Sequence, residues 1–373
     1  MSENFLPFVR PLIAPETIRG VGEVLASGWI ASGPEVEALE HELSAYLDGR
    51  PVLAYSHATG AMEEVLRALE IGPGDEVIVP DMTFATGINI VLRLGATPVL
   101  VDVDLETRNL DTARVEAALS TRTRAVMPVH YAGLAVDLDP LHALCKKHGL
   151  RVIEDAAHAI GAGYKGQRIG SFGDVACFSF QANKNLTTIE GAAISTADEG
   201  LLDNLRLRRF HGQKKCDDGS YDIVIPANKY NLSDVAARIG RDQLTVLDER
   251  NRRRRHLAEL YFAALANFDE LLLPARGGDE HAWHMFTVCV PFERLGTDRK
   301  RFRDAMQAMG IGVGMHYPAL HRLTVCRPFG FKSADFPNAD RIGRETVTLP
   351  LFPEMRDDDV ARVAAALKAV LYD

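Results

Sequence analysis

The sequence lacks the cysteine patterns of metal-binding and disulfide-rich proteins. Its 373 residues include five cysteines, an odd number, and none of them forms a CxxC pair. They are scattered at Cys145, Cys177, Cys216, Cys289 and Cys326. Such spacing is typical of small core residues in a reducing compartment, so we predict no metal site.

Long apolar runs and an excess of basic residues are also missing. No uninterrupted apolar stretch approaches the roughly 20 residues of a membrane span, and the opening MSENFLPFVRPLIAP has no signal-peptide pattern. The net charge is −9, whereas nucleic-acid binders usually present a basic face. The basic run Arg252–Arg255 lies in a helical pattern, which predicts a solvated face or an interface. We expect a cytoplasmic protein without membrane or nucleic-acid partners.

Strand and helix patterns alternate after two expected helices at 15–27 and 36–47. Strands are expected at 51–56, 76–81, 97–103, 124–130 and 151–155, and helices at 59–72, 83–95, 111–119 and 138–148. This alternation predicts an α/β fold with a mostly parallel sheet covered by helices on both faces. The strands expected at 174–180 and 191–197 have no helix between them, so part of the sheet should depart from simple alternation.

The pattern changes in the last third of the chain. Residues 212–230 are polar and glycine-containing and are expected to form a loop, followed by one long helix from Leu232 to about Phe262. Shorter strands and helices come next. We therefore predict a large α/β domain with an N-terminal arm over 1–249 and a small α+β domain over 250–373.

Polar residues collect at the carboxyl ends of the predicted strands. Ser56–Thr59, Thr83–Phe84, His130 and Asp155 all fall there, at the edge where parallel sheets bind ligands. The stretch 56–62, SHATGAM, combines a strand end, a turn and a helix N-terminus, which together can hold a phosphate. By itself this pattern fits any strand–turn–helix.

Four side chains allow both a structural and a chemical interpretation. Lys184, in a polar stretch after an expected strand, is either solvated or an amine whose pKa is lowered for nucleophilic attack. Asp155 either caps a turn or faces the ring nitrogen of a pyridine cofactor and keeps it protonated. Phe84 is either a core residue or a stacking face for a flat ring. Ser179 is either a satisfied core serine or a phosphate ligand.

The segment 152–192, VIEDAAHAIGAGYKGQRIGSFGDVACFSFQANKNLTTIEGA, resembles the core of the DegT/DnrJ/EryC1/StrS family of sugar aminotransferases that depend on pyridoxal 5′-phosphate (PLP). Further segments, from GWIASGPEVEALE to LPLFPEM, extend the likeness nearly end to end. The resemblance implies a fold-type I aminotransferase that works as a homodimer with active sites at the subunit interface. Two departures are His57-Ala58-Thr59, where the family often has Ser-Gly-Thr, and Ala192, where it usually has glycine.

The same resemblance implies residue roles. Lys184 matches the lysine that holds PLP covalently as an internal aldimine, Asp155 the partner of the pyridine nitrogen, and His158 a position beside the phenolic oxygen. Phe84 matches the stacking ring. The remaining matches are phosphate-binding positions (Ala58, Thr59, Ser179), a residue that reaches the neighbouring subunit's phosphate (Asn231), and a region near the sugar nucleotide (His316, Tyr317, His321).

The implied reaction moves an amino group from an amino acid, expected to be L-glutamate, to a keto-sugar linked to a nucleotide. HAWHMF and KYNLSD look most like the branch that acts on UDP-4-keto sugars, while the choice between C3 and C4 stays open. One alternative is a PLP-dependent sugar dehydratase, which Lys184 disfavours because that subset carries histidine in its place. The other is a non-catalytic PLP-binding regulatory protein, which only turnover excludes.

Overall fold

A computed structural model describes residues 5–372. Its centre is a sheet with strand order β1-β9-β8-β5-β4-β2-β3. These strands are β1 (Val52–Tyr55), β2 (Glu76–Pro80), β3 (Thr97–Val101), β4 (Thr123–Val126), β5 (Arg151–Asp155), β8 (Val175–Ser179) and β9 (Ala192–Thr196). Only β9 runs against its neighbours in this sheet, β1 and β8. The predicted mostly parallel sheet is confirmed, including its departure at β8 and β9.

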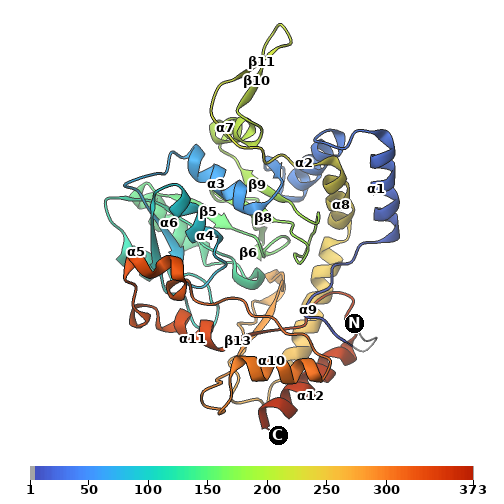
Figure 1. Cartoon of the computed structure of the whole chain (residues 1–373), viewed down its shortest axis with the longest axis vertical. Coiled ribbons are helices and arrows are strands. Elements are labelled where there is room, and N and C mark those ends of the chain that lie inside the picture. The colour runs from blue at the N-terminus through green and yellow to red at the C-terminus, as the bar shows by residue number, and fades with distance from the viewer. Residues whose placement is uncertain (1–4, 373) are drawn as a thin grey trace.

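Helices cover both faces of the sheet (Figure 1). On one face lie α3 (Ala58–Ala68), α4 (Thr86–Arg93) and α7 (Glu199–Arg209); on the other lie α2 (Pro34–Tyr46), α5 (Thr112–Ala118), α6 (Leu138–His148) and α8 (Asp234–Thr245). Along β1, Leu53 and Tyr55 enter the first core and Val52 and Ala54 the second. Successive strand residues point to opposite faces, so a strand buried on both faces must be apolar throughout.

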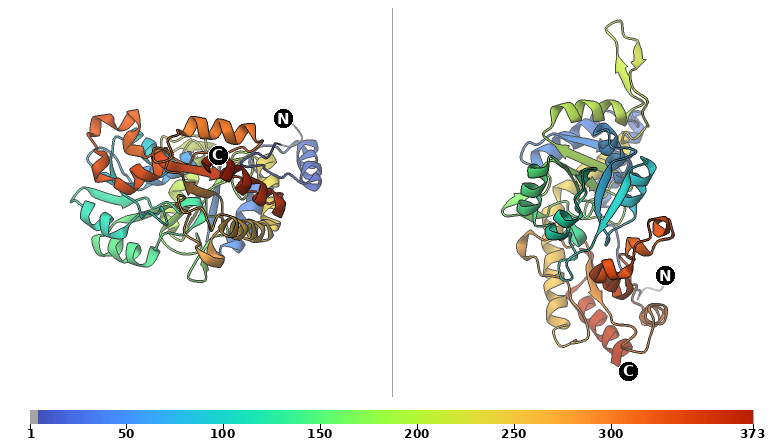
Figure 2. Two further views of the ribbon diagram at one scale, coloured as in Figure 1. Left: turned by 90° about the horizontal axis from the view of Figure 1, so that it is seen from below. Right: turned by 90° about the vertical axis from the view of Figure 1, so that its left-hand side faces the viewer.

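The C-terminal part has an apolar cluster of its own; its helices lie together at one end of the molecule in the right-hand view of Figure 2. It is enclosed by α9 (Leu247–Ala264), β12 (Phe286–Cys289), α10 (Arg299–Ala308), β13 (Thr346–Leu349) and α12 (Asp357–Tyr372). The N-terminal arm, whose residues 1–4 lie outside the described part, packs here: Leu6 N donates to Gly310 O at 2.9 Å and Gly312 N donates to Leu6 O at 2.8 Å. The boundary between residues 249 and 250 falls inside α9 and stays a prediction.

Two predictions between residues 212 and 262 were wrong. The expected loop contains a hairpin of β10 (Gln213–Lys215) and β11 (Tyr221–Ile223) that projects from the body (Figure 1). The expected long helix is divided into α8 and α9 at Val246, whose backbone is not helical (φ −113°, ψ 5°). The short strands β10 and β11 were not predicted because their segment is polar. The break at Val246 was not predicted because the helical pattern continues through it.

Two further helices complete this outline, α1 (Pro15–Ser27) and α11 (Pro337–Glu345). Among residues 5–372, no helix combines the length and apolar character needed to cross a membrane. Arg254, from the predicted solvated run, is buried instead, and its guanidinium donates to Leu351 O at 2.8 Å.

A buried carboxylate from α8 fixes the start of α2. Asp234 is 1% exposed, and its Oδ1 accepts hydrogen bonds from Gly33 N at 2.8 Å and Val36 N at 3.1 Å. Glu35 N donates to Oδ2 at 3.3 Å. The first N–H groups of a helix lack partners within the helix and carry partial positive charge. Asp234 therefore stabilises them both by accepting their hydrogen bonds and by its negative charge.

We predict that Asp234→Ala lowers the free energy of unfolding by about 2–3 kcal/mol, because three N–H donors lose a charged acceptor. Chemical denaturation measures the change. Asp203→Ala, which removes an exposed carboxylate paired with Arg206 at 2.7 Å, serves as the control and should unfold like the wild type. Equal behaviour of the two variants would show that Asp234 does not anchor α2.

Candidate active site

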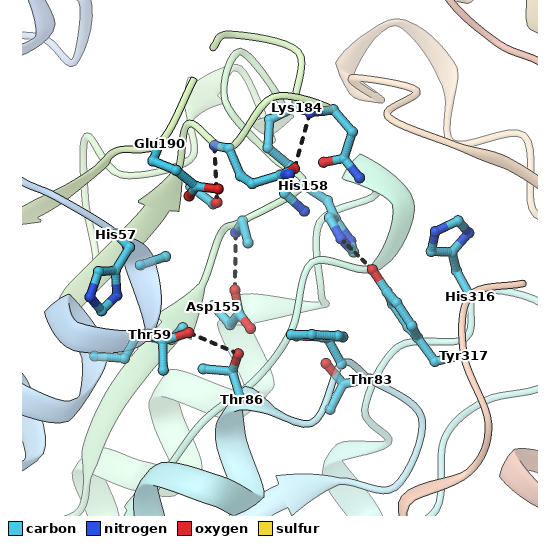
Figure 3. Close-up of a pocket in the computed structure, with 17 residues that line it drawn as sticks. His57, Thr59, Thr83, Thr86, Asp155, His158, Lys184, Glu190, His316 and Tyr317 are labelled. Carbon is cyan, nitrogen blue, oxygen red and sulfur yellow. Dashed lines mark hydrogen bonds between the residues drawn. The ribbon is translucent and has the colours of Figure 1, made fainter. Parts of the chain in front are cut away.

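A pocket of about 360 Å³ opens at the carboxyl ends of β5 and β8 (Figure 3). Its walls come from the start of α3, the segment between β2 and α4, the ends of β5 and β8, and the segment around His316. All predicted site residues except Asn231 and His321 line it. The strand-end clustering expected from the sequence therefore brings most of these residues to one open pocket, although His130 is not among its lining residues.

Lys184 enters this pocket from the loop that follows β8. Lys184 N donates to Gln181 O and Thr188 N donates to Phe180 O, each at 2.9 Å, so the loop folds back over the strand end. Burial lowers the pKa of the Lys184 ammonium to about 8, and the negative charge of Asp155 only partly opposes this change. A lysine with this pKa is substantially neutral near pH 8 and can act as a nucleophile or a base.

Asp155 ends β5 and is 7% exposed. Ala157 N donates to its Oδ1 at 3.0 Å, and no donor from residues 5–372 bonds to Oδ2. Burial raises the pKa of this carboxyl, although the Ala157 hydrogen bond and the charge of Lys184 act in the opposite direction. A cationic group on a ligand, such as a protonated pyridine nitrogen, would supply the missing counter-charge.

His158 is held in one orientation by three neighbours. Ala132 N donates to its Nδ1 at 3.3 Å, its ring stacks on His284 with centroids 4.6 Å apart, and its Nε2 lies 3.2 Å from the Tyr317 hydroxyl. Burial holds the pKa of His158 well below its usual range, helped by the charge of Lys184. Because Nδ1 accepts a hydrogen bond, the proton of the neutral ring is on Nε2 and is donated to Tyr317.

The start of α3 forms a corner suited to a phosphate. Ala58 and Thr59 are its first residues, so their backbone N–H groups have no partner inside the helix. Thr59 Oγ1 lies 3.2 Å from Thr86 Oγ1, and Ser179 closes the corner from the end of β8. Because Ala58 has a helical backbone, the alanine that replaces the family's glycine causes no strain here.

Two predicted residues lie outside the pocket lining. Asn231 donates to Ser32 Oγ at 2.6 Å and pairs with Tyr55. His321 is buried between carboxylates: its Nδ1 lies 2.6 Å from Asp81 Oδ2 and its Nε2 3.2 Å from Asp340 Oδ1. Burial disfavours its charge, but the two carboxylates outweigh that effect and raise the pKa of His321. The contacts of His321 are structural ones, and both functional roles stay predictions.

Thr83 and His57 belong to the predicted strand-end cluster but were given no role, and some other lining residues were not singled out from the sequence: Thr86, Gln181, Asn183 and Glu190. Most of these residues are close in sequence to residues that were singled out. Asn183 Oδ1 is buried without a hydrogen-bond partner among residues 5–372, which marks it as a possible ligand contact. His57 caps α3, since its Nδ1 accepts from Gly60 N at 2.9 Å. His130 stays behind the pocket, with its Nε2 3.0 Å from Glu154 Oε2.

The mostly parallel sheet covered by helices on both faces is an α/β fold, and its pocket holds a lysine and a carboxylate at adjacent strand ends. The chain belongs to the DegT/DnrJ/EryC1/StrS aminotransferase family, whose model matches residues 11–368. It is 40% identical to the spore coat polysaccharide biosynthesis protein SpsC of Bacillus subtilis (strain 168), over 99% of this chain and 97% of SpsC.

Solved structures agree with this membership. Spr1654 from Streptococcus pneumoniae, described as a sugar aminotransferase and solved in its PMP-form, has a TM-score of 0.92 at 33% identity, covering 98% of this chain and 97% of Spr1654. DesV of S. venezuelae, in complex with a ketimine intermediate, has a TM-score of 0.89 at 35% identity, covering 96% and 95%. A PLP-form of Spr1654 is similarly close. The predicted family, fold and enzyme class are confirmed, and PLP is the cofactor of this family.

The environment of Lys184 gives a pH-dependent prediction. In protein stripped of cofactor, we expect acylation of Lys184 by an amine-reactive reagent to reach half its limiting rate at about pH 8, because only the neutral amine reacts. Peptide mass spectrometry over a pH series measures the rate at each lysine. A midpoint for Lys184 near the ordinary lysine value of about 10.4 would show that the pocket does not desolvate the amine.

Proposed function

We propose that this protein is a PLP-dependent sugar aminotransferase that transfers an amino group from L-glutamate to a keto-sugar linked to a nucleotide. The observation that carries the proposal is the meeting of the Lys184 amine and the Asp155 carboxylate in one pocket of a chain from this family. The pKa shifts of both groups favour their neutral forms. A zwitterionic cofactor with a ring nitrogen and a phosphate is the kind of ligand that such a pocket requires.

The lining residues suit the parts of PLP. The cofactor supplies an aldehyde that bonds covalently to amines and a ring that withdraws electrons from the carbon next to it. In this proposal the Lys184 amine holds the aldehyde carbon, Asp155 the ring nitrogen, and Phe84 one face of the ring. Ala58, Thr59 and Ser179 hold the phosphate, and His158 lies beside the phenolic oxygen.

Lys184 is also the proposed proton carrier. With a pKa of about 8, its Nζ can take the α-proton of the amino donor and return a proton later in the cycle. Tyr317 is the proposed orienting group for the substrate: its oxygen accepts the His158 Nε2 proton, which leaves the hydroxyl hydrogen free to donate into the pocket. Burial raises the pKa of Tyr317, so this hydroxyl keeps its proton over the working pH range.

A homodimer is the proposed working form. Phe84 and Ile189, on and beside the pocket lining, are 58% and 59% exposed. Single exposed apolar side chains are common, but in this proposal the partner subunit covers these two beside the pocket. The projecting hairpin adds Tyr221, which is 66% exposed. Asn231 does not reach the pocket of its own subunit, which supports its proposed role at the partner's phosphate. The cytoplasmic location stays a prediction.

The identity of the sugar substrate is the most specific part of the proposal. The sequence likeness of HAWHMF and KYNLSD to the UDP-4-keto branch supports a UDP-linked substrate. In HAWHMF, His284 stacks on His158 and its Nδ1 lies 3.2 Å from Asn185 Oδ1, so this motif acts on the pocket through His158. The relation to a spore coat polysaccharide protein agrees with a role in making amino sugars.

Turnover tests the proposal directly. With L-glutamate and a panel of nucleotide keto-sugars, the holoenzyme should give an amino sugar, identified by its mass. Lys184→Ala should lower the rate by roughly 10³-fold or more, because both the covalent link and the proton carrier are lost. Lys165→Ala, which removes an exposed lysine paired with Asp139, is the control. Normal turnover by Lys184→Ala, or loss of an oxygen from the sugar without gain of nitrogen, would refute the proposal.

Mixed subunits test the shared site. Lys184→Ala and Asn231→Ala should each be nearly inactive alone, whereas unfolding and refolding them together should restore about a quarter of wild-type activity, because half of the random dimers contain one intact site. If Asn231 acts within its own subunit, or does not act at all, mixing restores nothing beyond the sum of the separate variants.

A further inference from the structure

A second cavity lies in the C-terminal part of the chain, and its lining residues differ from those of the catalytic pocket. It measures about 620 Å³, against about 360 Å³ for the catalytic pocket. Its walls are the segment 291–298, the start of α10 and the end of α11 (Figure 1). Five arginines line it: Arg294, Arg299, Arg322, Arg341 and Arg344. We call it the arginine groove. It shares Arg299 with a hollow of about 420 Å³ under α10.

Three of these arginines are neutralised by carboxylates. Arg341 Nε lies 3.1 Å from Glu345 Oε2. Arg322 and Arg344 share Asp340, at 2.5 Å and 3.1 Å. Two further carboxylates line the groove. Glu293 Oε1 lies 3.4 Å from Arg344 Nη1, and Asp298 is the N-cap of α10, where it accepts from Arg301 N at 2.8 Å. Among residues 5–372, none of the acidic residues of the groove therefore forms an ion pair with Arg299 or Arg294, although Arg294 is close enough to the Glu270 carboxylate to interact with its charge.

Arg299 is the partly buried member of that pair. It forms no ion pair with any carboxylate of residues 5–372; its Nη2 donates to Gly343 O at 2.7 Å, and its Nε is buried without a partner. Burial lowers the pKa of Arg299, and the charge of the Cys289 thiolate would only partly oppose this effect. Removing a cation from water without a counter-ion costs free energy. An anion bound in the groove would remove that cost.

The chemistry of the groove selects the kind of anion. A guanidinium presents planar paired donors that match the oxygens of phosphate. Arg299 is also the first residue of α10, a helix of 10 residues, whose start adds partial positive charge. We propose that the arginine groove binds a phosphate-type oxyanion, such as phosphate or diphosphate, through Arg299, at a site separate from the catalytic pocket.

The groove and the catalytic pocket share a wall. Pro318 lines the groove and Met315 the adjoining hollow, while His316 and Tyr317 between them line the catalytic pocket. The segment 315–318 therefore separates the arginine groove and the adjoining hollow from the catalytic pocket.

Titration of the holoenzyme with inorganic pyrophosphate tests the proposal, because bound cofactor already fills the phosphate corner of α3. Isothermal calorimetry should show binding that Arg299→Gln weakens at least tenfold, which corresponds to about 1.4 kcal/mol. Arg301→Gln, on the same helix with a side chain 76% exposed and outside the groove, should bind like the wild type. Arg299→Lys keeps the charge without the planar donors and should fall between them.

The position of the anion gives a second measurement. In holoenzyme crystals soaked with tungstate, a phosphate analogue, anomalous density should appear beside the Arg299 guanidinium and be absent in Arg299→Gln. Unchanged pyrophosphate affinity in Arg299→Gln, an equal loss in Arg301→Gln, or tungstate density confined to the catalytic pocket would overturn the proposal. None of these outcomes depends on turnover, so the result stands apart from the proposed function.

Discussion

The site depends on placing two groups of opposite charge, Lys184 and Asp155, in one water-poor pocket. Desolvation disfavours both charges: the pKa of the lysine falls to about 8 and that of the carboxyl rises. Among residues 5–372, the Asp155 side chain accepts a hydrogen bond from Ala157 N alone. The negative charge of Asp155 stabilises the Lys184 ammonium but does not compensate for its burial. A ligand that brings a cationic nitrogen to Asp155 and an electrophilic carbon to Lys184 removes the free-energy cost of burying both groups.

The sheet creates this juxtaposition. β5 and β8 are parallel neighbours, and Asp155 pairs with Cys177 across them. A residue at the end of β5 and a loop that folds back over the end of β8 therefore meet at the same edge, although they are far apart in sequence. The rest of the large domain supports that edge: α3 brings its N-terminus to it, and Asp234 ties α2 to α8 on the opposite face.

The sheet, most helices and the strand-end cluster could be predicted because they rest on local patterns. α1, α6 and β5 have the predicted limits, and the helix expected over 111–119 forms α5, which Asp111 caps by accepting from Ala113 N at 2.9 Å. The hairpin after α7 and the break at Val246 could not be predicted from the sequence. Polar strands and an interruption of one residue leave no periodic pattern of apolar residues. His321 shows a different limit: its partners Asp81 and Asp340 come from distant segments, and only the folded chain shows that its ring is already engaged.

The central claim is that Lys184 is the residue that holds the cofactor, and one measurement tests it most directly. Holoenzyme is reduced with borohydride, digested, and searched by mass spectrometry for the peptide that carries the pyridoxyl group. The account predicts a single modified peptide, with the group on Lys184. Modification of another lysine, or complete loss of the cofactor from the protein after reduction and denaturation, would contradict it.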